Sequence, residues 1–228
     1  SVVLQKSRSL DNKYDAQNYW LQIKNMDDES HAHIFASQVN VEEYIKDIML
    51  NIAEELLERK VNLQRVSDKN KLELEDIIND WVTSLLSQRK SFLGWKILDQ
   101  KRGGVSGSKE GVGEKDLVVK NSKNRNLFLF EAFKNKIEDH LNKLDSYNAT
   151  GCKLILVFVY TKEKDFTNYS TNYKNKISKM NYTGFDSMNL PVNIEKVDSQ
   201  SSTIHVYKEI RQKNQEETTI LHYLLDFN

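Results

Sequence analysis

The sequence has little of several features that define other classes of protein. Its single cysteine, Cys152, cannot form a disulfide within the chain or supply a zinc centre with several thiolate ligands. We expect Cys152 to be a buried packing residue, since it adjoins an apolar run. No apolar run approaches the roughly 18 to 20 residues that a membrane-spanning helix needs, and no leader with a basic start and an apolar centre is visible. These absences predict a cytoplasmic protein without a membrane partner.

Proline and glycine are also scarce, and the glycines are unevenly placed. Proline occurs once, and five of the eight glycines lie between residues 103 and 113. Glycine lets the backbone approach phosphate closely because it has no Cβ atom. The segment lacks the Gly-Lys-Ser/Thr ending of a phosphate-binding P-loop. Two interpretations therefore stay open: a flexible crossover between strands, or a loop that faces DNA.

Charge of neither sign is in excess, since 33 Lys and Arg balance 33 Asp and Glu. The distribution is less even, because residues 89–136 contain twelve basic and five acidic side chains, a net charge of +7. Affinity for nucleic acid follows the number of phosphates neutralised and does not require a basic protein. We therefore expect Lys101, Arg102, Lys109 and Lys136 to contact nucleic acid.

Two amphipathic helices are predicted before the glycine-rich loop. Between residues 40 and 59, apolar residues recur three and four positions apart, after Asn40 and Glu43 in the arrangement of a capping box. The same spacing predicts a helix from about residue 67 to about residue 88. Glu75 lies on the flank of the apolar side of this second helix.

Composition divides the chain into two units. Residues 1–37 are polar and irregular, and we interpret them as a peripheral arm. The predicted N-terminal unit, residues 1–66, consists of this arm and the first amphipathic helix. Residues 67–228 are predicted to form an α/β domain.

The glycine-rich loop leads into two short apolar runs that predict a β-hairpin. The first run opens with Asp116, and the second, residues 127–130, ends at Glu131. Pairing through a turn at residues 121–126 would bring the two carboxylates to one edge of the sheet, because the start of one antiparallel strand lies beside the end of the next. Two carboxylates at one edge can hold a divalent cation.

Further segments continue the alternation of strands and helices. A short mixed segment at residues 94–100 fits a strand before the loop, and a helix follows the hairpin as far as about Tyr147. Residues 153–160 are nearly all apolar, which is typical of a central strand buried on both faces. A right-handed crossover through the helix makes this strand parallel to the one before it. A helix at residues 166–180 and strands at residues 192–197, 203–210 and 218–225 predict an antiparallel extension of the sheet.

This order of elements resembles the PD-(D/E)XK, or restriction-endonuclease-like, nuclease superfamily over about residues 68–160. The family pattern is an Asp that opens the second core strand and a Glu-x-Lys that closes the third. Asp116 and Glu131 match it, whereas Lys134 stands one position late. The resemblance implies an α/β fold whose core is a helix, three antiparallel strands, a helix and a parallel strand. The N-terminal helix and the C-terminal strands are additions to this core.

The resemblance also implies a chemistry. Asp116, Glu131 and Glu75 are expected to hold Mg²⁺ or Mn²⁺, and Asp116, Glu131 and Lys134 are expected to be catalytic. Lys136 or Lys115 could take the place of Lys134 if the chain bends. The implied activity is metal-dependent hydrolysis of DNA phosphodiester bonds, in an effector of bacterial antiviral defence or DNA processing.

Other interpretations stay open. One is a catalytically inactive relative that binds nucleic acid or a protein partner through the same face. Another is a structural domain that uses the helix at residues 40–59 as a dimer face, in a homodimer or a larger assembly. His140 could serve the site as a proton shuttle or phosphate donor, although a lone helical histidine is more often structural.

Overall fold

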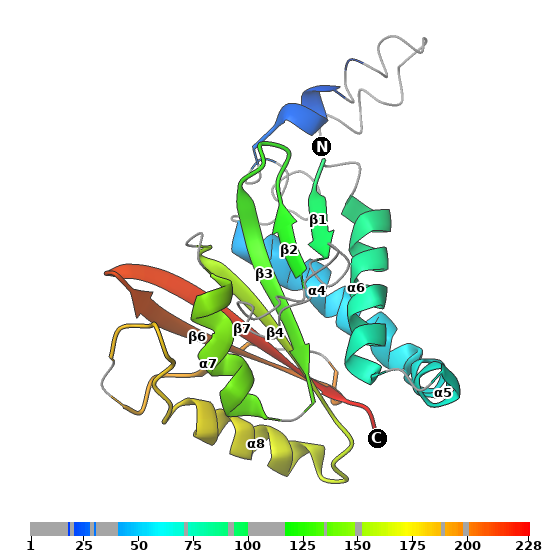
Figure 1. Cartoon of the computed structure of the whole chain (residues 1–228), viewed down its shortest axis with the longest axis vertical. Helices are drawn as coiled ribbons and strands as arrows, with labels where there is room; N and C mark the ends of the chain where they lie inside the picture. Colours follow the sequence, from blue (N-terminus) through cyan, green and yellow to red (C-terminus); the bar gives the residue numbers. More distant parts are fainter. Residues whose placement is uncertain are drawn as a thin grey trace, which may run out of the picture.

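The computed structural model describes residues 18, 21–27, 30, 41–70, 73–90, 94–99, 117–134, 136–148, 152–187, 190–197 and 201–228. These residues form an α/β fold built on a mixed seven-stranded sheet, with helices packed on both of its faces (Figure 1). The α/β class predicted from the sequence is confirmed. None of the helices in the described ranges is long and apolar enough to cross a membrane.

The sheet has the strand order β1-β2-β3-β4-β7-β6-β5. Its strands are β1 Lys96–Asp99, β2 Leu117–Lys120, β3 Asn126–Phe133, β4 Leu154–Thr161, β5 Glu195–Val197, β6 Ile204–Lys213 and β7 Glu216–Asp226. The principal helices are α4 Val41–Glu58, α5 Lys60–Asn70, α6 Leu74–Lys90, α7 Ile137–Tyr147 and α8 Phe166–Ile177.

The first four strands pair with one another as the sequence predicted. β1, β2 and β3 are antiparallel neighbours, and Leu117 of β2 lies opposite Phe130 of β3. The turn between β2 and β3 is closed by Asn121, whose Oδ1 accepts a hydrogen bond from the N–H of Arg125 at 2.9 Å. β4 is parallel to β3, and α7 forms the crossover between them. All eight residues of β4 are buried, as expected for a central strand.

The C-terminal strands join the sheet in a different way from the one predicted. β5, β6 and β7 are antiparallel to one another, but β7 lies parallel to β4 along its length. Local alternation indicates that these segments are strands, but it carries no information about which earlier strand they meet. The predicted antiparallel extension is therefore confirmed among β5, β6 and β7, whereas its junction with β4 is parallel.

The face of the sheet that α4 and α6 cover holds one of the two hydrophobic cores. Ile45, Met49 and Ile52 of α4 are fully buried there, together with Phe128 of β3 and Tyr223 of β7. The Tyr223 hydroxyl donates to the backbone oxygen of Lys46 at 3.1 Å, which ties α4 to the sheet. The apolar side of this helix, considered from the sequence as a dimer face, is therefore covered by the chain's own sheet.

The second predicted helix is two helices in the structure. α5 and α6 replace the single helix expected from about residue 67 to about residue 88. Only Leu63 of α5 is buried, so this helix has no apolar stripe to reveal it in the sequence. The predicted boundary between residues 66 and 67 falls inside α5.

The opposite face of the sheet, under α7 and α8, contains a buried network of ionisable side chains within its hydrophobic core. Glu209 is 1% exposed and accepts hydrogen bonds from Tyr182 Oη at 2.6 Å and from Arg211 Nη2 at 2.7 Å. Glu209 also contacts Nε2 of His222 at 2.9 Å, and Nδ1 of His222 lies 2.8 Å from Tyr173 Oη on α8. The network therefore joins β6 and β7 to the helix that covers them.

Arg211 completes this network at the end of α8. Its guanidinium donates to the backbone oxygens of Met180 and Ile177, at 2.8 and 3.1 Å, and lies over the ring of Tyr182 at 4.0 Å. Buried charges are tolerated when every one of them is paired and hydrogen-bonded, and removal of one partner is costly.

We expect Arg211→Ala to lower the free energy of unfolding by about 3 to 5 kcal/mol, because it leaves the buried Glu209 carboxylate without its cation. Arg125→Ala is the matched control, since Arg125 is exposed at the β2–β3 turn. This control should stay within about 0.5 kcal/mol of the wild type. Urea unfolding of the three proteins measures both effects. Equal losses in the two variants would contradict a special contribution from the network.

The same network predicts a loss of stability in acid. Burial opposes ionisation of Glu209, but the hydrogen bond and charge of His222, the charge of Arg211 and the hydrogen bond from Tyr182 together lower its pKa. A lowered pKa in the folded state contributes stability that is complete above the ordinary value of 4.5 and is lost as the pH falls below it. Unfolding free energies measured from neutral pH to below 4.5 should fall less steeply in Glu209→Gln than in the wild type. Identical slopes would refute this contribution.

Candidate functional site

A polar pocket of about 610 Å³ lies where β3 and β4 end, between α5 and α6 on one side and the start of α7 on the other. Ligands of α/β proteins commonly bind outside the carboxyl ends of parallel strands, which is the edge that this pocket occupies. The residues that line it are Gln64, Ser67, Asp68, Glu73, Leu74, Glu75, Asp76, Lys134, Lys136, His140, Tyr160 and Lys162. We call this cavity the polar pocket.

The two signs of charge reach the polar pocket from different elements. Its acidic residues are Asp68 of α5, Glu73 directly before α6, and Glu75 and Asp76 in the first turn of α6. Its lysines come from the junction of β3 with α7 and from the end of β4, where Lys162 directly follows Thr161. Carboxylates suit a hard divalent cation, and lysines suit phosphate. The pocket therefore contains groups suited to both parts of a metal–phosphate complex.

Lys134 reaches this pocket because β3 ends one residue earlier. Side chains alternate between faces only within a strand, and the strand assignment ends at Phe133. Lys134 is exposed and lines the polar pocket together with Lys136, whose backbone is left-handed, with φ of 55°. The chain thus turns between the strand and α7 with two lysines at the turn. The displacement of Lys134 by one position from the Glu-x-Lys pattern does not keep it out of the pocket.

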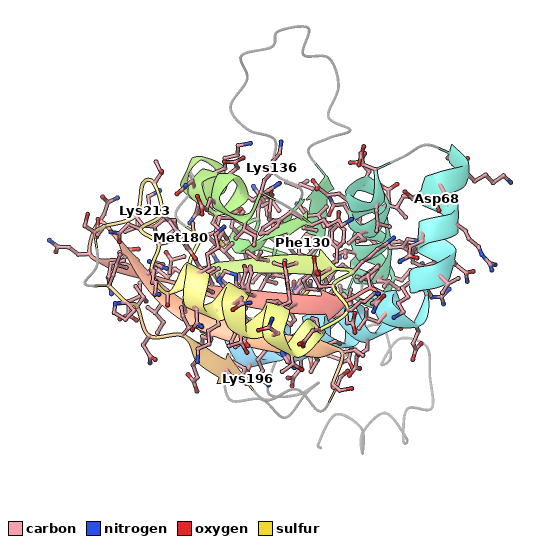
Figure 2. The ribbon with its side chains drawn as sticks, turned by 90° about the horizontal axis from the view of Figure 1, so that it is seen from below. Asp68, Phe130, Lys136, Met180, Lys196 and Lys213 are labelled. Carbon is pink, nitrogen blue, oxygen red and sulfur yellow. The ribbon has the colours of Figure 1, made fainter. Side chains whose placement is uncertain are left out.

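Glu131 forms a buried pair with His140 beside the pocket. Glu131 is 4% exposed within β3, and its Oε1 lies 2.9 Å from Nδ1 of His140 on α7. The imidazole also stacks on Phe133, with ring centres 4.5 Å apart and planes 17° apart. Phe133 and Glu131 share a face of β3, so one strand supplies both contacts that orient the ring. Lys136, which is labelled in Figure 2, directly precedes the first residue of α7.

The structure brings together four of the residues singled out from the sequence. Glu75, Lys134, Lys136 and His140 line one pocket, and Glu131 contacts it through His140. Sequence reasoning missed Lys162, although its position directly after a predicted parallel strand could have indicated it.

Other residues expected at the site lie outside the described part of the chain. They are Asp116, Lys101, Arg102, Lys109 and Lys115. Leu117, which follows Asp116 in the sequence, pairs with Phe130, the residue before Glu131. Leu117, the first residue of β2, therefore lies at the same end of the hairpin as Glu131.

The described carboxylates offer a divalent cation few ligands. Within the described ranges, no group of three or more His, Cys, Asp or Glu side chains could hold a metal ion. Glu75 lies in the polar pocket, whereas Oε1 of Glu131 is engaged by His140. The expected set of Asp116, Glu131 and Glu75 therefore depends on Asp116 for completion, and the described residues alone supply only part of a cation site.

A second pocket, of about 640 Å³, lies at the opposite end of the sheet. Ile45, Leu127 and Leu154 give it apolar walls, and Lys120, Arg125 and Lys153 are its basic residues. None of the residues expected to be catalytic lines it. It provides an internal comparison for the polar pocket, because it is basic but has no histidine among its lining residues.

Comparison of the chain with protein-family models, with curated proteins and with solved structures gives no match.

Proposed function

We propose that the polar pocket hydrolyses DNA phosphodiester bonds with the aid of Mg²⁺ or Mn²⁺. The observation that carries the proposal is the meeting of Glu75, Lys134, Lys136 and His140 in one pocket at the ends of β3 and β4. These residues come from separate parts of the chain, and their chemistry is that of cation and phosphate binding.

The arrangement of elements supports a restriction-endonuclease-like core as part of this proposal. α6, the antiparallel strands β1, β2 and β3, the crossover helix α7 and the parallel strand β4 follow one another in the order of that core. α4, α5 and the strands β5 to β7 are additions to it. Fold alone does not specify an activity, so the residues in the pocket carry the functional part of the proposal.

The proposal assigns cation binding to the carboxylates and phosphate binding to the lysines. Asp116, Glu131 and Glu75 would hold the cation, which supplies positive charge to the phosphate and an activated water when bound. Lys134 stabilises the negative charge that develops on the phosphate oxygens, and Lys136 and Lys162 bind phosphates on either side of the one that reacts. Loss of one preorganised group of this kind commonly slows a reaction by about 10² to 10³-fold.

A module that binds nucleic acid without cutting it is the second candidate. Lys134, Lys136 and Lys162 would serve such a module equally well, since phosphate binding needs only their charge. The two candidates differ in whether the bound strand is hydrolysed, and one assay separates them.

We expect the wild-type protein to cleave labelled single- or double-stranded DNA in the presence of Mg²⁺ or Mn²⁺. Asp116→Ala should abolish cleavage, and Lys134→Ala should slow it by about 10² to 10³-fold with the far-UV circular dichroism unchanged. Lys196→Ala is the matched control. Lys196 is an exposed residue of β5, the edge strand that is separated from β4 by β7 and β6 (Figure 2).

Three outcomes are decisive for this assay. Cleavage that needs metal and is lost in Asp116→Ala supports the nuclease. DNA binding without cleavage by any of the proteins supports the binding module instead. Absence of both cleavage and binding, or equal losses in Lys134→Ala and Lys196→Ala, would contradict both functions for the polar pocket.

A further inference from the structure

The Glu131–His140 pair gives the polar pocket a group that the metal-and-lysine arrangement does not include. Glu131 is buried in the sheet, whereas the side chain of His140 is partly exposed and lines the pocket. The imidazole is therefore the part of the pair that a substrate would meet, and the carboxylate lies behind it.

The hydrogen bond between Glu131 and His140 determines which imidazole nitrogen is a donor and which is an acceptor. A carboxylate oxygen can only accept, so Nδ1 of His140 carries the hydrogen that is shared with Oε1 of Glu131. In a neutral imidazole the other nitrogen, Nε2, then presents a lone pair and acts as an acceptor. Carboxylates that hold a histidine in this way select its tautomer and its orientation.

Two further contacts restrict the position of His140. Phe133 stacks on it at 4.5 Å, and the backbone N–H of His140 donates to the backbone oxygen of Lys136 at 3.2 Å. Lys136 is itself one of the lysines of the pocket. The imidazole and a phosphate-binding lysine are thus held by one short segment at the start of α7.

We propose that His140 is a catalytic residue that activates the attacking water through Nε2, and that Glu131 is its positioning residue. The inference rests on the proposed function, and it changes the role of Glu131 from a cation ligand to the partner of a general base. Of the described carboxylates expected to hold the cation, Glu75 is then the one that keeps this role.

Hydrolysis with His140 as the general base conserves atoms and protons. The oxygen of water forms a bond to phosphorus while its proton passes to Nε2 of His140. The bond from phosphorus to the leaving sugar oxygen breaks, and that oxygen takes a proton from solvent. The imidazolium then returns its proton to solvent.

A double-mutant cycle on cleavage tests the inference. Under single-turnover conditions with Mn²⁺, His140→Ala and Glu131→Ala should each reduce the rate by about 10² to 10⁴-fold. The double variant should be no more than about threefold slower than the slower single variant, because residues that act as one unit are not additive. Glu131→Gln should retain more activity than Glu131→Ala, since its amide oxygen still accepts from Nδ1.

His205→Ala is the matched control for loss of a hydrogen-bonded imidazole. Nδ1 of His205 lies 2.6 Å from Ser170 Oγ, and His205 does not line the polar pocket. This variant should cleave at the wild-type rate. Its thermal unfolding, compared with that of His140→Ala, separates a lost catalytic group from a loosened fold.

Two readouts do not depend on activity. Long-range ¹H–¹⁵N correlation spectra of the wild-type protein should show the His140 tautomer with hydrogen on Nδ1, and Glu131→Ala should lose this preference. The Mn²⁺ dissociation constant measured by calorimetry should change less than about twofold in His140→Ala and in Glu131→Gln. Hydrogen on Nε2 alone, or a tenfold loss of Mn²⁺ affinity in either variant, would overturn the assigned roles.

The cleavage results separate the inference from the function on which it rests. Wild-type cleavage with a fully active His140→Ala, or additive losses in the cycle, would overturn the inference and leave the nuclease intact. A wild-type protein that cleaves neither single- nor double-stranded DNA would overturn both.

Discussion

Parallel pairing of β3 with β4 is the constraint on which the arrangement of the site depends. Parallel neighbours cannot be joined by a tight turn, so the chain must leave the sheet, cross it as a helix and return. That crossover is α7, and its first turn lies over the face of β3 that bears Glu131 and Phe133. The same topology places Lys134 and Lys162, which follow the ends of the two strands, at one edge of the sheet. A polar pocket at this edge is a consequence of the strand pairing.

The two faces of the sheet are stabilised differently. Under α4 and α6 the core is aliphatic and aromatic, and it is tied to the sheet by the Tyr223 hydroxyl. Under α8 the core contains Glu209, Arg211 and His222, all buried and all hydrogen-bonded. The members of this network must meet in fixed geometry, whereas apolar contacts tolerate small displacements. We infer that the network specifies how α8 packs on the sheet. These three residues belong to β6 and β7 and do not line the polar pocket, so we assign the network to the fold and not to the chemistry.

Much of the fold was predictable because its signals are local. The β2–β3 hairpin has two apolar runs and a polar turn, and β4 is a nearly continuous apolar run, so pairing and burial followed from the sequence. α5 was missed because it buries Leu63 alone. The β4–β7 pairing was missed because side-chain alternation does not identify a partner strand.

The candidate site was predictable to the extent that its residues follow strand ends. Glu131 and Lys134 mark the end of β3, and Glu75 lies on the flank of α6. The hydrogen bond between Glu131 and His140 was not predictable from the sequence, because it depends on the position of α7 relative to β3. The reach of Lys134 depended on the residue at which β3 ends, and a shift of one residue would have reversed its direction.

Binding of a short phosphorothioate DNA that resists hydrolysis, followed by ¹⁵N NMR, tests most directly whether the polar pocket is the functional site. We predict that the signals of Lys134, Lys136, His140 and Lys162 shift together as the oligonucleotide is added, and that those of Lys120, Arg125 and Lys153 in the second pocket do not. Shifts confined to the second pocket would contradict the assignment.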